Sequence, residues 1–525
     1  MLRSHILRHL CEIGAIGFPG DSPGWLTLAS AHLDEMDSLL DYSGLLRSIP
    51  GTLGGEQRLK GWTRLAFTEQ EDRVHKYAVS VLKGMGFEVS VDSFGNLFGR
   101  KGVKEKPAVM IGTHLDTVID GGNYDGVVGF IVAIESVRRA EANGGLRHPV
   151  EIAIFRAEES TRFKMACLGS QAAFGFFSNQ MINSLADGQN RGSTLSDVLK
   201  NRGCDIRNIV QDCKNAKDYI AYFETHIEQA KKLEKSDKLG LVTSIRAPKR
   251  RSVVVSGKRR VQAVAAMILA VEFISKHYCY AGEDIVGTVG EVHGYFAGAD
   301  KINAVCGYCA SHFVKPLTSV DLESSRKIAS RRGCVTDDVD AAFGSRLETR
   351  GQTAHSGGTE MGLRQDALAA HSEIVLSLDD SYINEPLTEI EFFMDLRSNS
   401  SKALYSVNSR IDREFKDIVS DFQVECEVGN PIGDIDPVPK LDNKLRSFVK
   451  LVAEELKIET EEIPSGAGHD AMYAHKIGIP TSMIFIKSID GLSHTPEEFT
   501  PIGDIVRAID LQAAILQHPE FPIGS

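Results

Sequence analysis

Histidines and acidic residues of the kinds that bind divalent metal ions recur at separate points of this chain. They are His114, Asp116, Asp125, Glu158, Glu159, His226 and His494. Taken alone, each is more often a surface or structural residue. Together they suit a pair of divalent ions, because two ions that share a water need a bridging carboxylate and terminal histidine or carboxylate ligands. The chemistry expected of such a site is hydrolysis by an activated water.

The spacing of these residues suggests separate roles. In "THLD", Asp116 can accept the second ring N–H of His114 and so orient the imidazole. Of the adjacent pair Glu158 and Glu159, one can bind an ion while the other holds the water as a general base. Glycines in "GGNYDG" leave the backbone free to bring Asp125 under the ions.

Buried strands are expected to position these clusters. The short apolar runs "PAVMI", "PVEIAIF" and "PTSMIFI" come shortly before His114, Glu158 and His494. A helical stretch, "GVVGFIVAIESVRRAEANGG", separates the first two runs, and this strand–helix–strand order predicts a parallel α/β sheet. Since such sheets place active sites at the carboxyl ends of their strands, the clusters are expected to meet there.

A chain of 525 residues is too long for one ordinary core and indicates several domains. We expect an N-terminal extension over 1–60 and a catalytic domain in two parts, 61–245 and 431–525. Between them, 246–430 has the character of an α+β unit. A related order of strands and helices returns around 345–430, which suggests that this unit is enlarged or partly duplicated.

Composition excludes some function classes. The net charge is −12, with acidic and basic residues mixed along the chain, which argues against a nucleic-acid partner. No apolar run has the length of a membrane span. Charged residues interrupt the N-terminal stretch, which makes it a poor signal peptide. Nine scattered cysteines suit free thiols in a reducing compartment. A cytoplasmic protein without a membrane partner is therefore predicted.

Several motifs in one order resemble a known family. They are "FGNLFGR", "GTHLDTV", "GGNYDG", "FRAEESTRF", "ETHIEQ", "HSGG", "DLRS", "SGAGHDA" and "GLSHTPEE". From Gly61 onward the chain resembles the zinc-dependent, exopeptidase-like amidohydrolases of the M20 family, in the hydantoinase/carbamoylase branch. That branch contains N-carbamoyl-L-amino-acid hydrolases, allantoate amidohydrolases and β-ureidopropionases. The resemblance implies a mixed-sheet α/β catalytic domain with an inserted α+β lid through which the chain forms a homodimer.

The resemblance also implies the ligand set, with two divalent ions per subunit. One ion would be held by His114, Asp125 and His226, and the other by Asp125, Glu159 and His494, with Glu158 as the base. Peptidase relatives usually have a carboxylate where this chain has His226, so "HIEQ" favours the carbamoylase branch. Zinc, manganese, cobalt and nickel all suit these ligands.

For the substrate, the resemblance implies residues that lie mostly in the lid. His355 would reach the partner subunit's site and stabilise an oxyanion. Arg397 would grip a substrate carboxylate. Gln229 and an asparagine would complete the pocket. That asparagine is Asn303 by motif or Asn384 by its spacing to Arg397, and the spacing favours Asn384.

The expected function is hydrolysis of a linear C–N amide, in a carbamoyl, ureido or related N-acyl group, of a small-molecule carboxylate substrate. A peptidase or N-acyl-amino-acid hydrolase on the same scaffold is the alternative. A non-catalytic binding protein would have lost a ligand or the base, and none is missing. Departures such as "HIEQAK" and "HSGGTEM", and lid motifs split between two halves, leave the substrate open.

Overall fold

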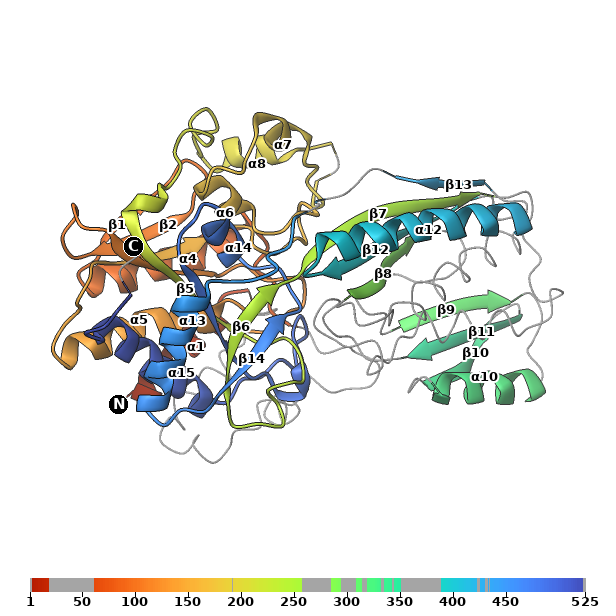
Figure 1. The fold of residues 1–525 in the computed structure, drawn as a ribbon. Coiled ribbons are helices and arrows are strands. Elements are labelled where there is room, and N and C mark those ends of the chain that lie inside the picture. Colours follow the sequence, from red (N-terminus) through yellow and green to blue (C-terminus); the bar gives the residue numbers. More distant parts are fainter. Residues whose placement is uncertain are drawn as a thin grey trace. The chain divides into compact units, whose positions relative to one another are not determined.

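The computed structural model describes residues 2–17, 61–190, 192–256, 285–293, 308–313, 319–331, 335–341, 344–350, 389–422, 425–429, 433 and 435–522. The chain divides into two compact units. Unit 1 comprises Met1–Ile245 and Val438–Ser525, and unit 2 comprises Arg246–Pro437. Figure 1 shows the elements of both units.

Unit 1 is built on an eight-stranded mixed sheet with the order β1-β2-β4-β3-β5-β15-β6-β14. Its strands are β1 (Glu88–Val91), β2 (Leu97–Lys101), β3 (Ala108–His114), β4 (Val150–Phe155), β5 (Tyr219–Ile227), β6 (Leu239–Ile245), β14 (Thr460–Ser465) and β15 (Thr481–Ile486). The central strands β4, β3, β5 and β15 pair in parallel, so their carboxyl ends share one edge. The predicted mixed-sheet α/β fold is confirmed.

Helices surround this sheet. They are α1 (Leu2–Gly14), α4 (Glu69–Gly84), α5 (Val127–Ala142), α6 (Leu168–Ala173), α7 (Asn179–Ser184), α8 (Leu195–Asn201), α13 (Asn443–Glu455), α14 (Ala471–Lys476) and α15 (Ile502–Gln517), with 3-10 turns at Ala216–Asp218 and Ile489–Gly491. Thr68 caps α4 by accepting the Glu71 N–H, and Val74, Ala78 and Leu82 form its buried face. None of the described helices is long and apolar enough to span a bilayer.

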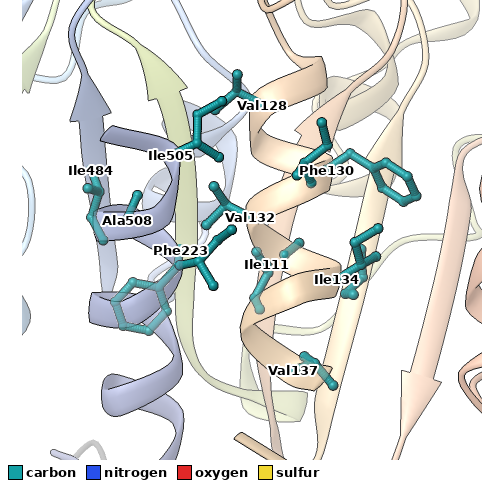
Figure 2. Close-up of a cluster of buried hydrophobic side chains, with 14 of the residues drawn as sticks. Ile111, Val128, Phe130, Val132, Ile134, Val137, Phe223, Ile484, Ile505 and Ala508 are labelled. Carbon is teal, nitrogen blue, oxygen red and sulfur yellow. The ribbon is translucent and has the colours of Figure 1, made fainter. Parts of the chain in front are cut away.

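The main core of unit 1 lies where α5 and α15 pack beside the sheet. Figure 2 shows Val128 and Val132 of α5 close to Ile505 of α15, with Ile111 of β3 and Phe223 of β5 beneath them. Helix α5 is buried on nearly every side, which explains its almost continuous apolar sequence. This packing fixes the two elements on either side of the loop that carries Asp125.

Unit 2 is an α+β unit with two antiparallel sheets. One has the order β13-β7-β12-β8, formed by β7 (Ala247–Ser256), β8 (Ile285–His293), β12 (Glu389–Ser398) and β13 (Glu425–Val428). The other has the order β10-β11-β9, formed by β9 (Tyr308–Phe313), β10 (Val335–Ala341) and β11 (Gly344–Arg350). The helices among its described residues are α10 (Ser319–Arg331) and α12 (Ser401–Phe422).

Candidate metal centre

The carboxyl edge of the parallel strands brings the predicted ligands together. They are His114 at the end of β3, Asp125 between β3 and α5, Glu159 after β4, His226 near the end of β5 and His494 after β15. Two groups among the described residues can each hold a metal ion: His114, Asp125 and His226, and Asp125, Glu159 and His494. All the ligand atoms within a group lie within 4.8 Å of one another.

Asp125 belongs to both groups, and each of its oxygens faces a different one. Its Oδ1 lies 3.3 Å from His114 Nε2 and 3.0 Å from His226 Nε2. Its Oδ2 lies 3.5 Å from His494 Nε2, which is itself 3.1 Å from Glu159 Oε1. This is the arrangement that a carboxylate bridging two ions requires.

The histidine rings are held so that one nitrogen of each faces the centre. His226 Nδ1 donates to the Ile227 carbonyl at 2.9 Å, which leaves Nε2 free to bind an ion. His114 Nδ1 lies 3.2 Å from the Asp116 carbonyl and 3.4 Å from Asp116 Oδ1. Asp116 thus occupies the place expected of an orienting acid.

The charges at this site suit a divalent cation. The acids Asp116, Asp125, Glu158 and Glu159 are all buried, and buried carboxylates are costly unless cations neutralise them. Burial opposes protonation of His114, yet Glu158, Asp116 and Asp125 outweigh it and raise the His114 pKa well above its usual range. Imidazoles and carboxylates together form a donor set for zinc, manganese, cobalt or nickel, so the residues fit the implied ions.

Asp116 also binds the segment that follows the neighbouring strand. Its Oδ2 accepts the backbone N–H of Glu159 at 3.1 Å, and its Oδ1 accepts that of Glu158 at 3.3 Å. These bonds were not expected from the sequence. They connect the ends of β3 and β4 through a single buried side chain.

Glu158 lies beside the first ligand group. Burial raises the pKa of Glu158 well above its usual range, and although His114 opposes this shift, Glu159 and Asp470 add to it. Oε2 lies 3.8 Å from His114 Nε2, and Oε1 accepts the Cys167 thiol at 3.4 Å. A carboxyl group in this environment takes up a proton readily, as a general base in hydrolysis must.

Several residues near the centre were not singled out from the sequence. Glu498 Oε1 accepts the backbone N–H groups of Tyr124 at 2.8 Å and of Asp125 at 2.9 Å. Ser493 Oγ donates to Asp125 Oδ2 at 2.8 Å. A Cβ at Gly122 would lie 2.2 Å from Glu498 Oε1, so glycine is required there. Ser493 and Glu498 begin and end "SHTPEE", the motif that contains His494. Their place in this motif was the sequence signal that could have identified them.

His469 is another such neighbour. Its ring centroid lies 4.7 Å from that of His226, and its Nε2 lies 2.8 Å from Ser465 Oγ. Its position within "SGAGHDA" was the signal for it. Gln229 donates from Nε2 to Asp125 Oδ2 at 2.5 Å, and its backbone is left-handed with φ of 59°. Its expected place in the substrate pocket stays a prediction.

The predicted substrate residues of the lid are only partly within the described residues. Arg397 lies on β12, where its Nη2 is 3.0 Å from Asp395 Oδ2. Arg250 of β7 contacts the same oxygen from its Nε at 3.0 Å. His355, Asn303 and Asn384 lie outside the described residues. Their roles and that of Arg397 stay predictions.

The chain is similar to known proteins of one family. The family model for peptidase family M20/M25/M40 matches residues 110–518. An uncharacterized hydrolase from Haemophilus influenzae is 29% identical, covering 94% of this chain and 99% of its own. The N-carbamoyl-L-amino-acid amidohydrolase of a Pseudomonas species is 24% identical, over 88% of this chain and 95% of its own.

A solved structure shows the same fold. It is an amidase of the hydantoinase/carbamoylase family from Burkholderia multivorans, with a TM-score of 0.62, 20% identity, and coverage of 94% of this chain and 98% of its own. The predicted resemblance is therefore confirmed, and the chain belongs to peptidase family M20/M25/M40.

Proposed function

We propose that this chain is a metal-dependent amidohydrolase that cleaves a linear C–N amide of a small carboxylate substrate. The bond would belong to a carbamoyl, ureido or related N-acyl group. The observation that carries the proposal is Asp125, whose two oxygens face two separate sets of ligand residues. Relatives named as amidohydrolases support a hydrolase of C–N bonds other than peptide bonds.

The site would hold two divalent ions per subunit. His114, Asp125 and His226 would hold one, and Asp125, Glu159 and His494 the other. When bound, such ions polarise a carbonyl oxygen and lower the pKa of a water. Zinc, manganese, cobalt and nickel remain the candidate metals.

Glu158 would move the proton. It would take a proton from the attacking water and pass it to the leaving nitrogen. The raised Glu158 pKa supports this role, because the protonated carboxyl must persist until the C–N bond breaks. For a ureido group, the released carbamate would then decompose to carbon dioxide and ammonia.

Unit 2 would act as the lid of this enzyme and form a homodimer. Arg397 would bind the substrate carboxylate, and His355 of the partner subunit would stabilise the oxyanion. Gln229 and either Asn384 or Asn303 would complete the pocket. The catalytic domain would comprise 61–245 and 431–525, in a cytoplasmic enzyme.

A peptidase or N-acyl-amino-acid hydrolase is the second candidate, because the family as a whole is named for peptidases. A substrate panel separates the two. The metal-loaded protein would be assayed on N-carbamoyl amino acids, allantoate, β-ureidopropionate, N-acetyl amino acids and dipeptides, with ammonia and free amine as readouts. Ammonia release from ureido substrates supports the proposal, whereas turnover of dipeptides alone would overturn it.

A further inference from the structure

We propose that the N-terminal segment, residues 2–17, is a working part of the metal centre. It would fix the loop that carries Asp125, and Asn123 would be the positioning residue through which it acts. The inference rests on the metal site of the proposed function. It adds the N-terminal segment, which contains none of the predicted ligands, as a support of that site.

Asn123 connects the two parts directly. Asn123 lies two residues before Asp125 in the sequence, and its side chain is buried. Its Nδ2 donates to the Leu10 carbonyl at 3.1 Å. Leu10 lies in α1, four residues before its last residue, Gly14. Asn123 Oδ1 accepts Arg64 Nη1 at 3.3 Å. The Asn123 amide therefore bonds on one side to the N-terminal helix and on the other to a buried arginine.

Arg64 makes a second connection between the same parts. Its side chain is fully buried, and its Nη1 donates to the Ile16 carbonyl at 3.2 Å. Its Nε donates to the carbonyl of Leu115 at 3.1 Å, and Leu115 lies between His114 and Asp116. One guanidinium thus bridges the N-terminal segment and the end of the strand that supplies a metal ligand.

Trp62 adds a third connection. Its Nε1 donates to the Gly14 carbonyl at 2.7 Å. Its backbone N–H and C=O both pair with Gly121, each at 2.9 Å. Gly121 begins the loop 121–126 that carries Asp125, called the metal loop below. These backbone bonds hold the loop against the segment around Trp62, which itself bonds to the end of α1. They use no ligand atom.

Helix α1 is itself anchored in the core. Ile6 and Ile13 are fully buried and belong to the main hydrophobic cluster with α5 and α15. His9 Nε2 lies 3.3 Å from Glu135 Oε1 on α5. Because α5 begins directly after the metal loop, the docked helix is fixed to the element that follows Asp125 as well as to the loop itself.

The metal loop needs such support because of its glycines. Gly121 and Gly122 precede Asp125, and Gly126 follows it with a φ of 68°. A loop of this composition gains much backbone freedom when it is not held. Residues that orient metal ligands from behind commonly change metal affinity by about 10- to 100-fold when they are removed.

Four variants of the full chain test the proposal. Asn123→Ala removes the connection, and Ile6→Ala loosens α1 without touching the site. Their double variant shows whether they act through the same contact. Ile182→Ala is the matched control, since this buried isoleucine lies in a second core cluster that contains neither α1 nor the metal loop. Two quantities would be measured: hydrogen exchange of the 121–126 amides in metal-free protein, and zinc affinity by chelator competition.

We expect faster exchange in 121–126 and a loss of zinc affinity of about tenfold or more for Asn123→Ala. Ile6→Ala should shift both quantities in the same direction, and the double variant should lose less than the product of the single losses. Ile182→Ala should leave both unchanged. Equal effects from Ile182→Ala, or no change in the loop for Asn123→Ala and Ile6→Ala, would overturn the proposal. If the wild-type protein binds no divalent ion, the proposed function fails, while the exchange rates still decide this inference.

Discussion

The Asp116 carboxylate accepts the backbone N–H of Glu159 at 3.1 Å. Its other oxygen lies 3.4 Å from His114 Nδ1, so one acid contacts both a candidate histidine ligand and the chain of a candidate carboxylate ligand. Both contacts are buried, where hydrogen bonds to a charged group contribute more than they do in water. Asp116 therefore sets the relative positions of candidate ligands that follow two different strands.

Asp116→Asn should weaken metal binding while leaving the fold intact. The amide NH₂ cannot accept the N–H groups that now point at both carboxylate oxygens. We expect a loss of about 10- to 100-fold in metal affinity, measured by chelator competition. Asp120→Asn is the control, because Asp120 lies exposed in the same loop. Wild-type affinity in Asp116→Asn would contradict the positioning role.

Glu158→Gln should retain bound metal and lose turnover. The amide has nearly the same shape but cannot take a proton from water. Loss of a general base lowers kcat by about 10²- to 10⁴-fold. Glu159→Gln is the matched comparison: it should lose metal, because Glu159 Oε1 belongs to the second ligand group. Metal content by elemental analysis and kcat on the best panel substrate separate the two outcomes, and an active Glu158→Gln would sink the base assignment.

The sheet and the family could be predicted because their signals are local. Apolar runs mark β3, β4 and β15, and polar residues follow each run directly. Parallel pairing then brings strand ends together without any further information from the sequence. His114 and His226, 112 residues apart, meet at 3.4 Å for this reason.

The supporting contacts could not be predicted because their partners carry no local pattern. Glu498 accepts the Asp125 backbone N–H from 373 residues away. Asn123 donates to a carbonyl of Leu10, and every residue has a backbone carbonyl. Residues 2–17, expected as part of an extension over 1–60, pack in the main core of unit 1. Pattern reasoning finds residue types, whereas these contacts depend on the tertiary fold.

Metal binding should release protons, and apparent affinity should rise with pH. Burial opposes the protonation of both His114 and His494. Nearby carboxylates outweigh burial and raise both pKa values well above the usual range. The strongest of these carboxylates is Glu158 for His114 and Glu159 for His494. The raised pKa values favour the doubly protonated rings in the metal-free protein, and an ion binds only a ring that has lost the second proton. Calorimetric titration in buffers of different ionisation enthalpy measures the protons released. Binding heats that do not depend on the buffer would contradict this expectation.

Arg397→Ala should raise KM for carboxylate substrates by about tenfold to hundredfold, the usual range for a lost charge-assisted bond. Arg397→Lys should recover only part of the loss, because an ammonium cannot bind a carboxylate in the same two-pronged way. Arg250→Lys is the control, since Arg250 contacts the same Asp395 from the neighbouring strand. If KM in Arg397→Ala equals that of the wild type, the carboxylate anchor lies elsewhere.

Asp395 should stabilise unit 2 in a pH-dependent way. Burial opposes its ionisation, but Arg397 and Arg250 outweigh burial and lower the Asp395 pKa from 3.8 to about 2. Because the folded pKa is the lower one, the stabilisation is present above about pH 4 and disappears as the pH falls through about 2. The shift corresponds to about 2 kcal/mol at neutral pH.

Asp395→Asn removes that contribution and leaves two guanidinium groups without their shared carboxylate. We expect a loss of about 3 kcal/mol at pH 7, the lower end of the range for breaking a buried ion pair, because Asp395 is partly buried. Urea unfolding of the wild type and Asp395→Asn, followed at pH 7 and again near pH 3, measures both the loss and its decrease with acid. The difference between the two proteins should shrink at the lower pH, because the wild-type carboxylate is then closer to its own protonation. A difference that stays constant between the two pH values would show that Asp395 contributes through its shape and hydrogen bonds, not through its charge.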